Sequence, residues 1–220
     1  GRVKPDIAQR VRQTATDLGY KPNPLARSLR TSKTRILGFI SEEVATTPYA
    51  GGIILGAQDA ASTYGYMLIT VSTDGQASEE SEIAALKRYG VDGFFYSKMS
   101  NRIATVPKSL SDYPVVLVDA TDANNTLPSV EPDEFQIAYD ATSRLIEAGC
   151  ERIAYVGCAE NMIAQDGRLA GYRAALEGTD HGFDASLVCN VLNNGPALRA
   201  VDALFNTYNP DGFFCFNDAR

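Results

Sequence analysis

From residue 36 onward, short apolar runs alternate with longer stretches in which apolar residues recur every three or four positions. The short runs predict buried β-strands because they are apolar throughout, and the longer stretches predict amphipathic helices. The predicted strands are 36–40, 66–71, 93–96, 115–118, 153–156, 187–191 and 212–216. The predicted helices of this part are 51–64, 78–89, 135–148, 167–177 and 197–208.

Strands that alternate with helices are typical of a parallel sheet covered by helices on both faces. Right-handed crossovers then predict a doubly wound α/β fold, which binds ligands at the carboxyl ends of its strands. Those ends are rich in carboxylates, amides and hydroxyls, at 41–43, 72–74, 119–120, 131–133, 157–160 and 217–218. As a set they suit a neutral polyhydroxylated ligand, although any one carboxylate could equally be a solvated helix cap.

The first 35 residues follow a different pattern, with a short amphipathic helix predicted over 5–19. Pro5 suits the first helical position and Gly19 suits the C-terminal cap. A helix this short is marginal alone in water, so we expect its apolar face to pack against a partner. The residues of that face are Ile7, Val11, Ala15 and Leu18.

Charge divides the chain at the same place. Residues 1–35 hold nine Lys/Arg and two Asp/Glu, whereas residues 36–220 hold eleven basic and twenty-five acidic residues. The net charge of −7 therefore combines a basic arm of +7 with an acidic body of −14. After a Pro-containing break at 20–24, residues 25–30 predict one or two helical turns that carry Arg27 and Arg30. Such an arm favours contact with the phosphates of DNA, and an ordinary solvated N-terminus is the alternative.

Several functional classes find little support in the composition. The chain has one histidine, His181, and four cysteines without a CxxC pair, so a metal site and a His-dependent catalytic triad are not expected. Nucleotide-binding glycine loops and a GxSxG elbow do not occur, so we expect neither an enzyme nor a cofactor. No apolar run approaches the ~20 residues of a membrane span, and the first residues do not resemble a secretion signal. We therefore expect a cytoplasmic protein with no membrane partner.

Residues 19–30, GYKPNPLARSLR, followed by TRILG at 34–38, resemble the hinge region of LacI-type bacterial transcriptional repressors (the LacI/GalR family). Further matches to that family follow in order along the chain. They are DGFF at 92–95, LIEAGCERIAYVG at 145–157, GRLAGY at 167–172 and FCFND at 214–218. The resemblance implies a repressor that binds operator DNA as a homodimer and is controlled by a small effector.

In the arm, the resemblance implies a partial helix-turn-helix headpiece and a hinge helix within residues 1–35. The hinge helix would pair with its twin in the minor groove, and Leu29 would insert between base pairs as a wedge. The residues expected to contact DNA are Asn23, Ala26, Arg27, Leu29 and Arg30.

In the body, the resemblance implies two subdomains like those of periplasmic sugar-binding proteins, at 36–134 and 135–220. A sugar or sugar derivative is expected between them, held by Tyr49, Asp133, Arg168, Asn217 and Asp218. Leu192 stands where some family members stack an aromatic ring on the ligand, which leaves purines open. Because family members extend beyond this sequence at both ends, we expect a truncated chain with an incomplete second subdomain.

A sugar-specific solute-binding protein without a DNA-binding role is the main alternative, since it would share the body. Such a protein should carry a signal peptide and should not carry the basic segment at 27–30. An enzyme on a doubly wound sheet is the third possibility, and no nucleophile–base pair or cofactor loop supports it.

Overall fold

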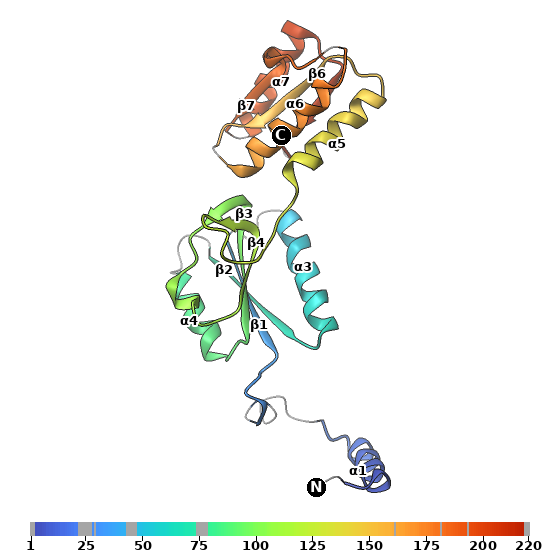
Figure 1. Cartoon of the computed structure of the whole chain (residues 1–220), viewed down its shortest axis with the longest axis vertical. Helices are drawn as coiled ribbons and strands as arrows, with labels where there is room; N and C mark the ends of the chain where they lie inside the picture. Colours follow the sequence, from blue (N-terminus) through green and yellow to red (C-terminus); the bar gives the residue numbers. More distant parts are fainter. Residues whose placement is uncertain are drawn as a thin grey trace.

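The computed structural model describes residues 3–21, 28, 30–42, 48–73, 79–160, 162–180, 182–192 and 194–217. Residues 36–217 form two separate parallel sheets, each with helices on both sides (Figure 1). The predicted doubly wound α/β class is therefore confirmed. Within the described residues, no helix is long and apolar enough to cross a membrane.

The first sheet has the strand order β2-β1-β3-β4-β5, and every neighbouring pair is parallel. Its strands are β1 (Ile36–Glu42), β2 (Met67–Thr73), β3 (Gly93–Ala104), β4 (Val115–Asp122) and β5 (Ser129–Val130). Helices α3 (Pro48–Thr63) and α4 (Glu79–Arg88) lie on opposite sides of it, and the 3-10 turn η1 (Lys108–Leu110) precedes β4. Ile83 and Leu86 of α4 are buried against Ile40 and Phe94, which gives this sheet its main core.

The second sheet has the order β7-β6-β8, again parallel throughout. Its elements are α5 (Glu134–Glu147), β6 (Ile153–Cys158), α6 (Ile163–Glu177), η2 (Ala185–Leu187), β7 (Val188–Val191), α7 (Asn194–Tyr208) and β8 (Gly212–Cys215). Alternate residues of β6 face opposite sides, as the pleat requires. Tyr155 packs against Tyr172 of α6, whereas Ala154 packs against Leu204 of α7. The strand is therefore buried on both faces, which explains its unbroken apolar sequence.

The two sheets repeat one arrangement. In each, the first strand along the chain lies between the second and the third, as β2-β1-β3 and β7-β6-β8. Strands β1 and β6 therefore occupy corresponding places within these groups of three strands.

The helix predicted over 5–19 and each strand and helix predicted from residue 36 onward are present, with ends shifted by a few residues. Most of the helical turns predicted over 25–30 lie outside the described residues. The largest difference is β3, which continues from the predicted 93–96 to Ala104. Residues 97–102 are mostly polar, and the β3–β4 register shifts between Ser97 and Arg102, so this part has no apolar pattern to detect. Strand β5 was not predicted because two residues are too short to show any periodicity.

The arm begins with α1 (Pro5–Asp17), which lies apart from both sheets in Figure 1. Gly19 adopts a φ of 66°, and the Tyr20 backbone N–H donates to the Ala15 carbonyl at 2.8 Å, so the predicted glycine cap is confirmed. The predicted apolar face is exposed, with Leu18 78 % accessible, and no described part of the chain covers it. The expected packing partner is thus not within the described residues.

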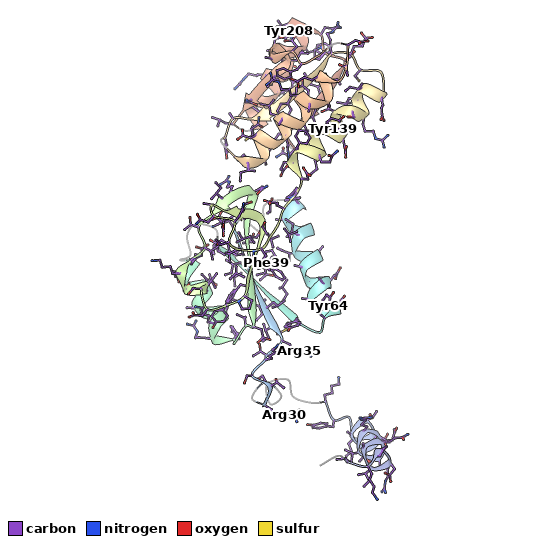
Figure 2. All side chains as sticks on the ribbon, viewed as in Figure 1. Arg30, Arg35, Phe39, Tyr64, Tyr139 and Tyr208 are labelled. Atoms are coloured by element: carbon purple, nitrogen blue, oxygen red, sulfur yellow. The ribbon has the colours of Figure 1, made fainter. Side chains whose placement is uncertain are left out.

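Of residues 25–30, which are expected to form the hinge helix, the structure describes only 28 and 30. Ser28, Arg30 and Thr31 are helical, and the Ser32 N–H donates to the Ser28 carbonyl at 2.8 Å. Figure 2 shows Arg30 in this segment and Arg35 where it meets the first sheet. The expected DNA-contacting residues Asn23, Ala26, Arg27 and Leu29 lie outside the described residues.

Candidate functional site

Polar side chains from both sheets share one electrostatic environment around Tyr49, at the start of α3. Burial raises the pKa of the Tyr49 phenol to about 12, and the carboxylates of Asp119 and Glu134 raise it as well, while the Arg168 guanidinium lowers it. Tyr49 and Asp119 belong to elements of the first sheet, whereas Glu134 and Arg168 belong to α5 and α6. Helix α6 of the second sheet also lies against β3 of the first sheet. We therefore take Tyr49, Asp119, Glu134 and Arg168 as one candidate site.

Arg168 is held by three contacts within this site. Its Nε donates to Glu134 Oε2 at 2.6 Å, and its Nη1 donates to the Phe216 carbonyl. The guanidinium also lies over the Phe216 ring, 4.4 Å from the ring centroid. The Glu134 side chain is only 5 % exposed and that of Arg168 is 19 % exposed, so this ion pair is shielded from water. The guanidinium is therefore fixed before any ligand binds.

Two glycines allow the helices that carry this pair to approach closely. A Cβ at Gly167 would lie 2.7 Å from the Glu134 Cβ, and a Cβ at Gly171 would lie 2.1 Å from the Phe135 carbonyl oxygen. Any larger residue would force α5 and α6 apart. The GRLAGY sequence at 167–172 thus places Arg168 beside Glu134 through its small residues.

The first sheet contributes an unusual backbone conformation to the site. Asp119 has a φ of 53° and is 1 % exposed, and its Oδ1 accepts the Asn101 backbone N–H at 3.1 Å. Asn101 itself has a φ of 44°, next to the register shift in β3. Aspartate and asparagine adopt the left-handed conformation more readily than other residues that carry a side chain, so both positions suit the residues found there.

The expected effector residues have different outcomes. Tyr49 lies at the start of α3 with 49 % of its surface exposed, and the Arg168 guanidinium is one of the charges that act on the pKa of its phenol. Asp133 is exposed and caps α5, with Oδ1 accepting the Gln136 backbone N–H at 3.0 Å. Asn217 is exposed and directly follows Phe216, whose carbonyl Arg168 contacts, while Asp218 lies outside the described residues.

Two residues of this site were not among the predicted effector residues. Asp119 follows the predicted strand 115–118 and was counted only among the polar strand ends. Glu134 follows Asp133 and received no role. The predicted helix begins at residue 135, so the sequence pattern holds no signal that Glu134 lies in its first turn and faces Arg168.

One ion pair links the two sheets beside this site. Arg102 Nη2, in β3, lies 3.4 Å from Glu160 Oε2, in the segment after β6. Both side chains are about half exposed, at 51 % and 46 %, so this pair contributes little to stability. Breaking this ion pair would therefore cost little free energy.

The described ranges hold no group of three or more His, Cys, Asp or Glu side chains that could hold a metal ion. Burial raises the pKa of the Cys189 and Cys215 thiols, which flank Val156 on neighbouring strands. These thiols are consequently poor nucleophiles and poor metal ligands at neutral pH.

The fold and the site together define a binding protein of the periplasmic-binding-protein class, with two doubly wound units and a polar site that draws on both. The chain belongs to the family described as periplasmic binding proteins and sugar binding domain of LacI family, whose model matches residues 34–220.

Relatives of known name agree with this assignment. The chain is 33 % identical over 190 residues to the HTH-type transcriptional regulator RegA of Clostridium saccharobutylicum, covering 84 % of this chain and 57 % of the relative. It is 33 % identical over 212 residues to catabolite control protein A of Priestia megaterium, covering 92 % and 62 %. The chain thus spans about three-fifths of the length of these relatives.

Solved structures show the same fold. The structure of the transcriptional regulator CelR in complex with cellobiose superposes with a TM-score of 0.65 at 25 % sequence identity. That match covers 97 % of this chain and 66 % of the CelR chain.

Proposed function

We propose that this chain is the effector-responsive part of a DNA-binding transcriptional repressor. A small effector, a sugar or sugar derivative, binds between the two subdomains at 36–134 and 135–220 and controls operator affinity. The observation that carries this proposal is the shielded Arg168–Glu134 pair, which lies on helices of the second sheet where α6 also contacts β3 of the first sheet. A ligand that contacts both subdomains favours one relative arrangement of them and so shifts the population of that arrangement.

The DNA-binding part of the proposal rests on the basic arm at 1–35 and its hinge. Two copies of the chain form a homodimer whose paired hinge helices enter the minor groove, with Leu29 as the wedge. Asn23, Ala26, Arg27 and Arg30 contact the groove or the phosphates. Because the coupling free energy is reciprocal, operator DNA changes effector affinity by the same factor as the effector changes operator affinity.

The comparisons support a regulator rather than the solute-binding alternative. The named relatives are a transcriptional regulator and a catabolite control protein, and the CelR structure contains cellobiose. The family description itself includes a sugar-binding domain. We accordingly propose a cytoplasmic regulator that is not an enzyme, with Asp133, Asn217 and Asp218 as further effector contacts.

A thermal-shift screen tests the effector site. The chain is heated with neutral sugars beginning with cellobiose, with sugar phosphates and with purines. A ligand present at a hundred times its Kd stabilises the folded state by about 2.7 kcal/mol. We expect at least one ligand class to raise the melting temperature, and we expect Arg168→Ala to abolish that rise.

Arg173→Ala is the matched control, because Arg173 lies on the same helix and pairs with Glu177 at 3.0 Å with 58 % of its side chain exposed. The control should keep the full ligand-induced rise. If Arg168→Ala keeps it as well, Arg168 does not bind the effector.

A further inference from the structure

We propose that this site rejects anionic ligands and that Glu134 is the residue responsible for the rejection. This inference rests on the effector role proposed above for the surroundings of Arg168. The effector is therefore an uncharged polyhydroxylated molecule rather than a phosphorylated or carboxylated one. An arginine at a ligand site usually favours anions, since its fork of donors matches phosphate and carboxylate oxygens. In this structure the positive charge of Arg168 is already paired with the Glu134 carboxylate.

The contacts of Arg168 show how it is matched. Its Nε donates to the Glu134 carboxylate at 2.6 Å, and Nη1 donates to the Phe216 carbonyl. One face of the guanidinium lies 4.4 Å from the centroid of the Phe216 ring. An anion that sought a bidentate contact with Arg168 would have to compete with Glu134 for the same group.

The Glu134 carboxylate is shielded from water where it pairs with Arg168. The side chain is 5 % exposed, and its Cβ occupies the space next to Gly167, where an added Cβ would lie 2.7 Å away. A carboxylate left buried without its partner is strongly destabilising. The binding of an anion would therefore have to offset the free energy of an unpaired buried charge.

The first sheet adds charge of the same sign. Asp119 is 1 % exposed and fixed by the Asn101 N–H, and its carboxylate acts on the Tyr49 hydroxyl together with that of Glu134. The Arg168–Glu134 pair carries no net formal charge, and Asp119 adds a carboxylate that also acts on Tyr49. A second anion at this place would be repelled from both sheets.

An uncharged polyol can bind without displacing Glu134 and without repulsion from the carboxylates. Guanidinium carries five N–H donors, and a hydroxyl oxygen can accept from those not used by Glu134 and Phe216 while the ion pair stays whole. Tyr49 offers a hydroxyl that stays protonated at neutral pH, since its pKa is raised to about 12. The geometry thus permits hydroxyl recognition without separating Arg168 from Glu134.

Inorganic phosphate is the probe that tests this inference, in titrations monitored by calorimetry at constant ionic strength. The proteins are the unmodified chain, Glu134→Gln, Glu134→Gln combined with Arg168→Met, and the control Glu147→Gln. Glu147 lies on the same helix and pairs with Arg144 at 3.0 Å, but 65 % of its side chain is exposed. It therefore matches the change in charge without touching the site.

We expect no saturable phosphate binding by the unmodified chain or Glu147→Gln at millimolar concentrations. Glu134→Gln should bind phosphate saturably, with a Kd about tenfold or more below the highest concentration tested on the unmodified chain, and adding Arg168→Met should remove that binding. Phosphate binding by the unmodified chain that Arg168→Met abolishes would overturn the inference. So would a folded Glu134→Gln variant without any gain. If that variant does not fold, the unmodified chain and Arg168→Met alone decide the matter by the same criterion.

These outcomes separate this inference from the proposed function. A chain that responds to no neutral sugar contradicts the sugar effector, and the phosphate comparison still reports the charge selectivity of the site. A chain that binds phosphate through Arg168 contradicts the charge selectivity and leaves an effector-controlled repressor standing.

Discussion

Asp92 and Asp211 make the same contact at the start of two different sheets. The Asp92 carboxylate accepts the backbone N–H groups of Thr34 at 3.1 Å and Arg35 at 2.9 Å, directly before strand β1. The Asp211 carboxylate accepts those of Glu151 and Arg152, at 3.0 and 2.8 Å, directly before central strand β6. Each aspartate precedes the glycine that begins the neighbouring strand, β3 or β8. The two contacts differ in what they hold, because Asp92 fixes the point where the basic arm leaves the body.

Removal of the Asp92 carboxylate should loosen the arm without unfolding the body. In Asp92→Ala, the Thr34 and Arg35 amides and the Thr34 hydroxyl lose their shared acceptor. Hydrogen bonds to a charged group contribute about 1.5–3 kcal/mol, and less at an exposed junction such as this one. We expect trypsin to cleave after Lys33 and Arg35 about tenfold faster than in the unmodified chain.

Asp211→Ala is the matched control for this experiment. It removes the equivalent contact from the second sheet, so cleavage after Lys33 and Arg35 should keep its original rate. Equal acceleration by both substitutions would mean that Asp92 acts only through global stability.

The Asp211 contact also predicts a pH dependence. Backbone N–H groups, that of Glu151 foremost, lower the pKa of the Asp211 carboxyl below its ordinary value of 3.8. A group whose pKa is lower in the folded state stabilises the fold fully above its unfolded pKa, and the effect is lost as the pH falls through the folded pKa. Asp211→Asn should therefore flatten the acid decline of the unfolding free energy below about pH 4.

Part of that decline should remain in Asp211→Asn. Hydrogen bonds from Thr126 lower the pKa of Asp122, and hydrogen bonds from Ser186 lower that of Asp184. Urea unfolding at a series of pH values measures the slope. Parallel curves for Asp211→Asn and the unmodified chain would show that the lowered pKa does not contribute to stability.

The strands and helices could be predicted because their signals are local. Strand β6 reads as an apolar run since both of its faces are buried, and α1 ends at Gly19 because a positive φ favours glycine there. The Asp92 contact could not be predicted in this way. The Asp-Gly pair was visible as a family motif, but its partners lie 57 and 58 residues earlier in the chain.

In the candidate site, too, some residues could be predicted from the sequence and others could not. Arg168 could be named from the family resemblance, whereas Glu134 could not be told apart from Asp133. Asp133 has φ −77° and ψ 87°, outside the helical region, so its carboxylate turns back to cap its own helix. Glu134 is the first helical residue and points inward to Arg168. Which of two adjacent carboxylates faces the site depends on the residue at which the helix begins, and sequence patterns place such ends only within a few residues.

The basic arm predicts a specific effect on DNA binding. If Arg30 contacts a phosphate, Arg30→Gln should weaken binding to duplex DNA of any sequence and reduce the slope of log K against log salt concentration by about one. Arg144→Gln is the control, since Arg144 is an exposed arginine on α5, with 83 % of its side chain accessible. Fluorescence anisotropy at several salt concentrations measures the slope. An unchanged slope for Arg30→Gln would remove Arg30 from the DNA-contacting residues.

Because α5 and α6 lie close together at Gly171, we expect the addition of a single methyl group there to lower the stability of the fold strongly. In Gly171→Ala the new Cβ would lie 2.1 Å from the Phe135 carbonyl oxygen and 2.9 Å from the Tyr139 backbone nitrogen. Both are backbone atoms that cannot rotate away, so the helices must separate, at a free-energy change of about 3 kcal/mol. The separation should also lengthen the Arg168–Glu134 contact, so that any ligand-induced rise in melting temperature falls together with the stability.

Gly178→Ala is the control for this substitution, at the C-terminal end of the same helix. Its φ is −81°, and a new Cβ there would meet its nearest neighbour, the Ala175 carbonyl oxygen, at 3.6 Å, an ordinary contact distance. We expect a change within about 0.5 kcal/mol for this variant. Calorimetric melting of both variants provides the measurement. Equal melting temperatures would show that α5 and α6 can separate freely, and Gly171 would then not be the residue that holds Arg168 against Glu134.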